Sequence, residues 1–239
     1  MDSYLRESLS PQQSQTPKAL IAPHAGFIYS GPIAGSAYSC LSKSRDIIKR
    51  VVIIGPSHRI GFRGIACSHD DAFRTPMGIV EIDKKAYETI SHLPFIITYD
   101  QAHRDEHGLE VQLPFLQATL SSFLIVPLVV GDAAGKEVAE VLSSLWGGPE
   151  TLIVVSSDLS HYLVYDEAVK LDQRTTRSIE MLTPNEIAAH QACGRRPIQG
   201  LLMNAAHQHL SVTSLDVRNS GDTAGDKQQV VGYGAYAFG

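Results

Sequence analysis

Short apolar runs alternate with longer amphipathic stretches along the 239 residues of the chain. The clearest runs lie at 20–22, 51–54, 95–98, 124–130 and 152–155, followed by two more at 212–217 and 230–238. Helices are predicted between these runs at 33–41, 84–91, 109–120, 136–145 and 166–181. Apolar runs without alternation indicate strands that are buried on both faces. The pattern therefore predicts an α/β fold, a single-domain layered sandwich with a mostly parallel central sheet.

Two further helix starts are predicted in the last third of the chain. Thr183 is suited to an N-cap, with Pro184 at the first helical position and Glu186 at the third. A helix over 187–192 should follow this start. Another helix is expected from Pro197 onward.

The composition limits the classes of protein to consider. Residues 1–18 are polar and lack the apolar core of a signal peptide, so we expect a flexible N-terminal arm before a domain at 19–239. The longest apolar stretch, 123–130, is far shorter than the roughly 20 residues that span a bilayer. The net charge is −5 and no run of Lys or Arg stands out, which argues against nucleic acid or a membrane as a partner. These features predict a cytoplasmic protein.

Polar residues follow three of the predicted strands. His24 and His58 come after the first and second strands, and Asp158 and His161 after the fifth. Parallel strands bind ligands beyond their carboxyl ends, so we expect these side chains to lie together. Imidazole suits zinc, iron and copper, and two histidines with one anionic ligand are typical of non-haem iron oxygenases and of some zinc hydrolases. The sequence therefore predicts a metal site whose chemistry depends on a third ligand.

Three residues are candidates for that third ligand: Asp158, Glu106 and Cys193. Cys193 lies between two predicted helices and is followed by Gly194, Arg195 and Arg196. A helix N-terminus and nearby guanidinium groups are expected to lower the pKa of the thiol. A buried, unreactive cysteine is the alternative.

The segment Asp105-Glu106-His107 opens another predicted helix. Acidic residues in a first helical turn are stabilised by the helix dipole, and this alone can explain why they occur there. Alternatively, Glu106 or His107 hydrogen-bonds a metal ligand or acts as a general acid or base beside the ion.

Six short motifs occur in a fixed order: 22–26 (APHAG), 55–58 (GPSH), 74–76 (RTP), 105–107 (DEH), 155–158 (VSSD) with His161, and 193–195 (CGR) with Pro197. Together they resemble the Memo family, which is similar in fold to class III extradiol dioxygenases of the protocatechuate 4,5-dioxygenase type. The resemblance runs from about residue 20 to the C-terminus. It implies that His24, His58 and Cys193 are the metal ligands, and that Asp158, His161 and Glu106 line the same pocket.

The resemblance also carries expectations about activity. Extradiol dioxygenases hold iron with two histidines and a glutamate, and here a cysteine takes the place of that carboxylate. A softer ligand favours copper or a differently tuned iron, so ring cleavage cannot simply be transferred. We expect a metal-dependent redox protein with one transition-metal ion, iron or copper, with zinc as the alternative. His161 would act as acid or base, Asp158 would orient it, and Glu106 would assist.

Two other functions stay open at this point. Microbial members of the family resemble protein B of the AmmeMemoRadiSam system, so Amme-type and radical SAM proteins are expected partners. The chain would then be a non-catalytic module that uses its pocket to bind a peptide or a partner. A zinc ion with an open position would instead make it a metallohydrolase.

Overall fold

A nine-stranded sheet forms the centre of the computed structural model, which describes residues 1–8 and 16–239. The order is β10-β11-β1-β8-β2-β7-β3-β6, and β9 pairs with β11. The strands are β1 (Ala19–Ala22), β2 (Arg50–Pro56), β3 (Ile65–Cys67), β6 (Ile96–Thr98), β7 (Leu124–Val130), β8 (Thr151–Ser156), β9 (His161–Leu163), β10 (Val212–Asn219) and β11 (Val230–Phe238). The neighbours β1, β8, β2 and β7 are parallel, which confirms the predicted mostly parallel α/β sheet.

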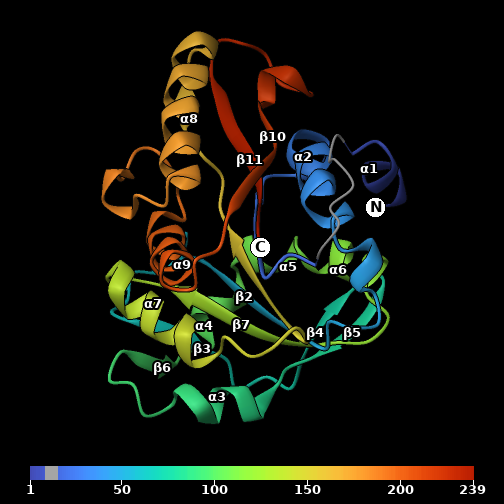
Figure 1. The fold of residues 1–239 in the computed structure, drawn as a ribbon, viewed down its shortest axis with the longest axis vertical. Helices are drawn as coiled ribbons and strands as arrows, with labels where there is room; N and C mark the ends of the chain where they lie inside the picture. The colour runs from blue at the N-terminus through green and yellow to red at the C-terminus, as the bar shows by residue number, and fades with distance from the viewer. Residues whose placement is uncertain (9–15) are drawn as a thin grey trace.

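Helices cover both faces of this sheet (Figure 1). They are α1 (Asp2–Arg6), α2 (Phe27–Ser39), α3 (Lys84–Ile90), α4 (Gln101–Arg104), α5 (His107–Glu110), α6 (Leu113–Thr119), α7 (Gly135–Ser144), α8 (Tyr165–Glu180) and α9 (Arg195–His207). Val52 and Ile54 of β2 pack into the core that contains α7 and α9, and Val51 and Ile53 pack into the core that contains α2 and α6. Because alternate residues are buried on opposite faces, residues 51–54 of β2 are all apolar.

The structure adds short elements that the apolar pattern did not reveal. These are β3, β9 and a separate hairpin formed by β4 (Ala72–Thr75) and β5 (Gly78–Glu81). The helix predicted over 109–120 is divided into α5 and α6. Pro114 lies in the first turn of α6, where its missing N–H cannot continue a hydrogen-bonded turn from α5.

The helix predicted over 187–192 is wrong. Residues Pro184–Glu186 form a single 3₁₀ turn, and a turn follows instead of a helix. The side chain of Gln191 accepts a hydrogen bond from the backbone N–H of Ala188 and donates one to Thr175 Oγ1 of α8. Hydrogen bonds between side chains and the backbone compete with the backbone hydrogen bonds of a helix. The position of the Gln191 side chain depends on α8, because Thr175 belongs to that helix.

The first helix packs against the second. Tyr4 of α1 lies over Gly31 and Gly35 of α2, where a Cβ at Gly35 would come 2.3 Å from the Tyr4 carbonyl oxygen. Residues 9–15 of the predicted arm lie outside the described residues, and the flexibility of residues 1–18 stays a prediction.

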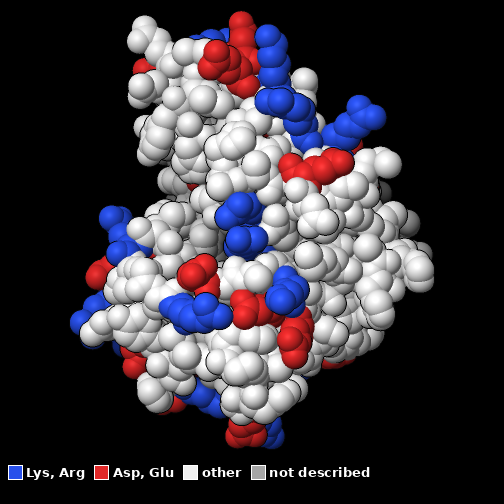
Figure 2. All heavy atoms as spheres, turned by 90° about the vertical axis from the view of Figure 1, so that its left-hand side faces the viewer, with Lys and Arg blue, Asp and Glu red and all other residues white. Residues whose placement is uncertain are grey.

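Two features of the structure reflect the composition: the mixture of charges at the surface and the hydropathy of the helices. On the face shown in Figure 2, acidic and basic side chains lie beside one another across the lower half, with no broad region of one sign. Among the described helices, none combines the length and the hydropathy needed to cross a bilayer.

Candidate metal centre

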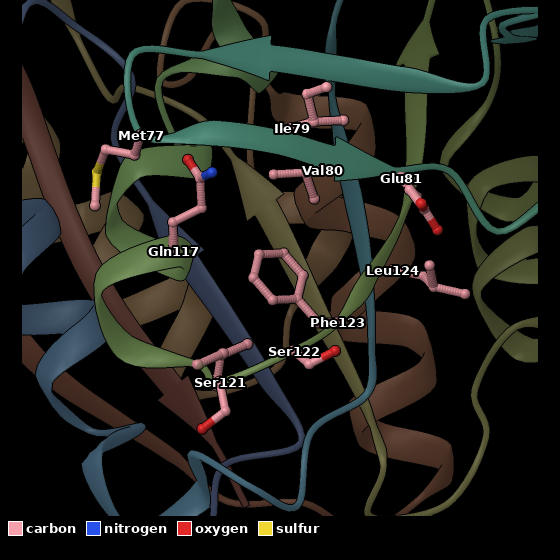
Figure 3. Close-up of a pocket in the computed structure, with 10 residues that line it drawn as sticks. Met77, Ile79, Val80, Glu81, Gln117, Ser121, Ser122, Phe123 and Leu124 are labelled. Atoms are coloured by element: carbon pink, nitrogen blue, oxygen red, sulfur yellow. The ribbon is translucent and has the colours of Figure 1, made fainter.

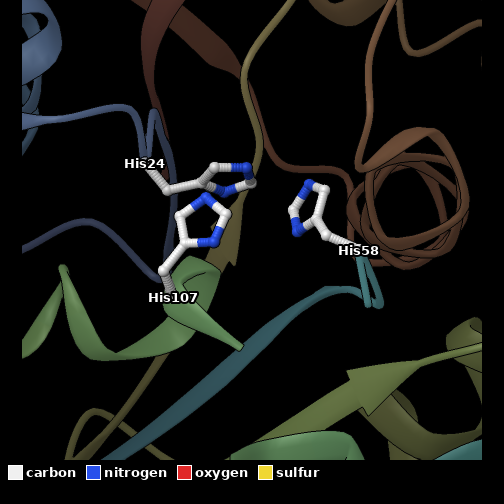
Figure 4. A group of neighbouring side chains, drawn as sticks. All are labelled: His24, His58 and His107. Carbon is white, nitrogen blue, oxygen red and sulfur yellow. The ribbon is translucent and has the colours of Figure 1, made fainter. Parts of the chain in front are cut away.

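Three imidazoles converge at the carboxyl edge of the sheet (Figure 4). His24 follows β1, His58 follows β2, and His107 begins α5. Their ring centroids are 5.0 Å apart for His24 and His58, 5.0 Å for His58 and His107, and 5.6 Å for His24 and His107. The rings of His24 and His58 meet because β1 and β2 are both parallel neighbours of β8.

Hydrogen bonds determine which nitrogen of His24 faces the centre. Its Nδ1 lies 2.9 Å from Ser156 Oγ. The Ser156 hydroxyl donates to the carbonyl of Gly108 and accepts from Gln112 Nε2, so it is available to His24 only as an acceptor. Nδ1 therefore carries the proton and Nε2 presents a lone pair. His24 is 2% exposed, and burial lowers its pKa despite the charge of Asp158, which keeps the ring neutral.

Glu106 plays the corresponding part for His58. Glu106 Oε1 lies 2.8 Å from His58 Nδ1, and Oε2 accepts the backbone N–H of the same residue at 2.7 Å. Gly108 N–H also donates to Oε1, at 2.8 Å. Burial alone would raise the pKa of Glu106, but the hydrogen bonds from His58 and Gly108 lower it to about 2. The carboxylate is thus ionised and directs the Nε2 of His58 outward, an arrangement typical of metal-binding histidines.

His107 belongs to the same cluster. Its ring stacks on that of His58 with an interplanar angle of 29°, and its side chain is 43% exposed. One ligand atom from each of the three histidines lies within 4.8 Å of the other two. The sequence suggested His107 only as a neighbour of the ion, because it lies at the start of a helix and does not follow a strand.

Cys193 approaches the cluster from the turn before α9. Its Sγ lies 3.3 Å from His24 Nε2 and accepts the backbone N–H of Asp158 at 3.3 Å. The approach requires Gly194, because a Cβ there would come 2.6 Å from Ser157 Cβ. The expected lowering of the thiol pKa is wrong: burial raises it to about 12, and the charge of Asp158 adds to this. A bound cation would instead favour the thiolate form of Cys193, because metal binding displaces the thiol proton.

Asp158 and His161 make separate hydrogen bonds. Asp158 Oδ1 accepts the backbone N–H of His24 at 2.8 Å and that of Ala25 at 3.3 Å, so it holds the loop after β1. His161 Nδ1 donates to the carbonyl of Leu159 at 2.8 Å, so Nε2 is the ring nitrogen that this bond does not use. We expected Asp158 to orient His161, whereas the structure gives that role to the Leu159 carbonyl.

The donors fit a transition-metal ion. Imidazole and thiolate ligands suit zinc, iron and copper. Nitrogen ligands of one ion at about 2.1 Å lie at most about 4.2 Å apart. The described histidine atoms, within 4.8 Å of each other, would close around an ion with movements of several tenths of an ångström.

A separate hollow of about 560 Å³ lies beside the β4–β5 hairpin (Figure 3). Its lining includes Met77, Ile79, Phe123 and Leu124, and among the described lining residues there is no imidazole or thiol. Leu124 begins β7, so this hollow lies at the amino end of that strand, away from the histidine cluster. This hollow and the histidine cluster are therefore separate features of the molecule.

Comparison with known proteins agrees with the motifs. The family described as Memo-like protein matches residues 1–237. The chain is 37% identical over 237 residues to a MEMO1 family protein of Aquifex aeolicus, covering 93% of this chain and 86% of the relative. It is 38% identical over 234 residues to a MEMO1 family protein of Aeropyrum pernix, covering 91% and 82%.

A solved structure shares the fold. The crystal structure of the uncharacterized protein JW3007 from Escherichia coli K12 matches with a TM-score of 0.60 and 13% identity, covering 92% of this chain and 99% of that one. At this identity the likeness concerns the fold alone. The family match over nearly the whole chain and the relatives above 30% identity show that this chain belongs to the Memo family.

Proposed function

We propose that the chain binds one transition-metal ion, iron or copper, through Nε2 of His24, Nε2 of His58 and Sγ of Cys193, and that it acts in metal-dependent redox chemistry. One observation carries the proposal: both histidines have Nδ1 engaged, by Ser156 and by Glu106, and so leave Nε2 as the nitrogen available to an ion. Imidazoles whose other ring nitrogen is fixed in this way are typical metal ligands. His107 stands beside them as a further donor.

The protein side chains have defined roles in this proposal. A bound iron or copper ion would supply electron transfer and open positions for oxygen or a substrate. Cys193 must lose its proton to bind, and the backbone N–H of Asp158 stabilises the resulting thiolate. His161 has Nδ1 bonded to the Leu159 carbonyl, and its Nε2 would act as the acid or base for substrate protons.

A second candidate function is a zinc metallohydrolase. The cluster of His24, His58 and His107 favours it, because three histidines with one open position form a common catalytic zinc site. Zinc in such a site lowers the pKa of a bound water and makes it a nucleophile. Cys193 would then lie beside the ion without binding it.

Metal analysis separates these candidates. Protein purified without nickel affinity resin should contain about one iron or copper per chain, the Cys193→Ala variant should lose it, and His107→Ala should keep it. Full retention in Cys193→Ala with loss in His107→Ala would contradict the cysteine ligand and support the three-histidine site. Stoichiometric zinc with oxygen-independent ester hydrolysis would support the metallohydrolase.

The Amme-type and radical SAM partners stay predictions, as does a purely partner-binding role. Co-purification with either protein, combined with an absence of bound metal in freshly isolated chain, would support the binding module over the redox protein.

A further inference from the structure

A cavity of about 280 Å³ opens beside Cys193 at the carboxyl ends of β2 and β7. Ser57 comes from the end of β2, Asp132 from the turn after β7, and Arg196 from the first turn of α9. Open α/β sheets bind their ligands in this position, where neighbouring parallel strands end. The volume is close to the lower limit of about 300 Å³ for small-molecule sites, so the ligand must be small.

One wall of the cavity is apolar. Ile60, Phe62, Val130 and Pro197 line it, and the last two are buried. The ring of Phe62 meets that of Tyr99 edge to face at 5.6 Å, which limits its movement. This wall fits a flat ring or a short hydrocarbon chain.

The basic group of the cavity is held in place. Arg196 Nη1 donates to Gln199 Oε1 at 3.1 Å, and Gln199 Nε2 donates in turn to the carbonyls of Pro184 and Ile187. Among the described residues, no ion pair includes Arg196. One of its five N–H donors is thus used within the protein, and the others are available to a carboxylate.

Asp132 restricts the charge of the ligand. It lines the cavity but is exposed, and its backbone holds Phe62 through a hydrogen bond of 2.7 Å from Asp132 N–H to the Phe62 carbonyl. A second negative charge on the ligand would meet this carboxylate. One guanidinium and one carboxylate therefore favour a ligand with a single negative charge.

We infer that this cavity binds a small monocarboxylate with an apolar ring or chain. Its carboxylate contacts Arg196, and its apolar body lies along Phe62 and Val130. The opposite end reaches Cys193, whose Sγ is 3.3 Å from His24 Nε2. The inference rests on the proposed function in one respect, since the carboxylate becomes a substrate only if the ion binds at Cys193.

Benzoate and its uncharged analogue benzamide test the site in metal-free, ¹⁵N-labelled protein. Benzoate should shift the amide signals of Gly61 and Gly131, which line the cavity, and benzamide should bind at least about tenfold more weakly. Arg196→Gln should weaken benzoate binding by a similar factor. Arg195→Gln makes the same charge change one residue away, outside the lining, and should leave the affinity within about twofold.

Three results would overturn the inference: equal binding of benzoate and benzamide, equal losses in the two arginine variants, or no shift at either glycine. The metal content of each variant is measured in parallel. If the protein binds metal but does not bind benzoate, only the carboxylate site in the cavity is refuted. If the protein binds benzoate but never contains metal, only the proposed function is refuted.

Discussion

Replacing Glu106 with glutamine removes the charge that orients His58. The side chain of Glu106 is 1% exposed, and its two oxygens accept from His58 Nδ1, His58 N–H and Gly108 N–H. Glutamine has nearly the same shape, but its NH₂ group cannot accept a hydrogen bond. The variant therefore leaves at least one of these three donors without an acceptor and no longer fixes the proton on Nδ1.

The pKa of Glu106 sets the size of the effect. It falls from the ordinary 4.5 to about 2 on folding, so the folded state favours the ionised carboxylate. At 1.36 kcal/mol per pKa unit this is about 3 kcal/mol of stability at neutral pH. Because the folded pKa is the lower one, this contribution is complete above about pH 5.5 and is lost as the pH falls toward 2, with about 2 kcal/mol lost by pH 3.

Urea unfolding of metal-free protein between pH 6 and pH 3 measures this loss. The free energy of unfolding of the wild type should decrease by about 2 kcal/mol more than that of Glu106→Gln over this range. Glu110→Gln, on the exposed side of the same helix, is the matched control and should behave as the wild type does. Equal pH dependence in wild type and Glu106→Gln would refute the assignment of a charged carboxylate bonded to His58.

Three other predictions concern the same site. Gly194→Ala should lower stability by about 1–3 kcal/mol and weaken metal binding, because the new methyl group meets Ser157 and displaces Cys193; unchanged thermal unfolding and metal content would contradict this. Ser156→Ala should cost about 1–3 kcal/mol in urea unfolding, because it leaves the buried Nδ1–H of His24 without an acceptor, and an unaltered midpoint would count against that bond. Cys193 in metal-free protein should react with iodoacetamide at pH 8 far more slowly than a free thiol, since its pKa is about 12; alkylation at the rate of glutathione, followed by mass spectrometry, would show the opposite.

The convergence of His24 and His58 was predictable because it follows from topology. Each comes directly after an apolar run, and parallel strands end at one edge of the sheet. Nothing more than strand order is needed to place them together. Asp158 is placed near them in the same way, since it follows β8 and β8 lies between β1 and β2.

Other features of the site depend on contacts between distant segments. His107 reaches the cluster because Glu106 caps α5 by accepting a hydrogen bond from the Gly108 N–H. The periodicity of apolar residues along the strands does not predict this arrangement. The pKa of Cys193 rises because packing of Gly194 on Ser157 buries the thiol, and neither the spacing nor the neighbouring arginines reveal this. The turn at 187–192 is likewise set by the bond from Gln191 to Thr175, sixteen residues away.

X-ray absorption spectroscopy of the metal-loaded protein tests the central claim most directly. We predict one iron or copper ion with a sulfur ligand at about 2.3 Å and imidazole nitrogens at about 2.0–2.1 Å. The sulfur contribution should disappear in Cys193→Ala. A spectrum of the wild type with nitrogen and oxygen ligands only would contradict coordination by Cys193.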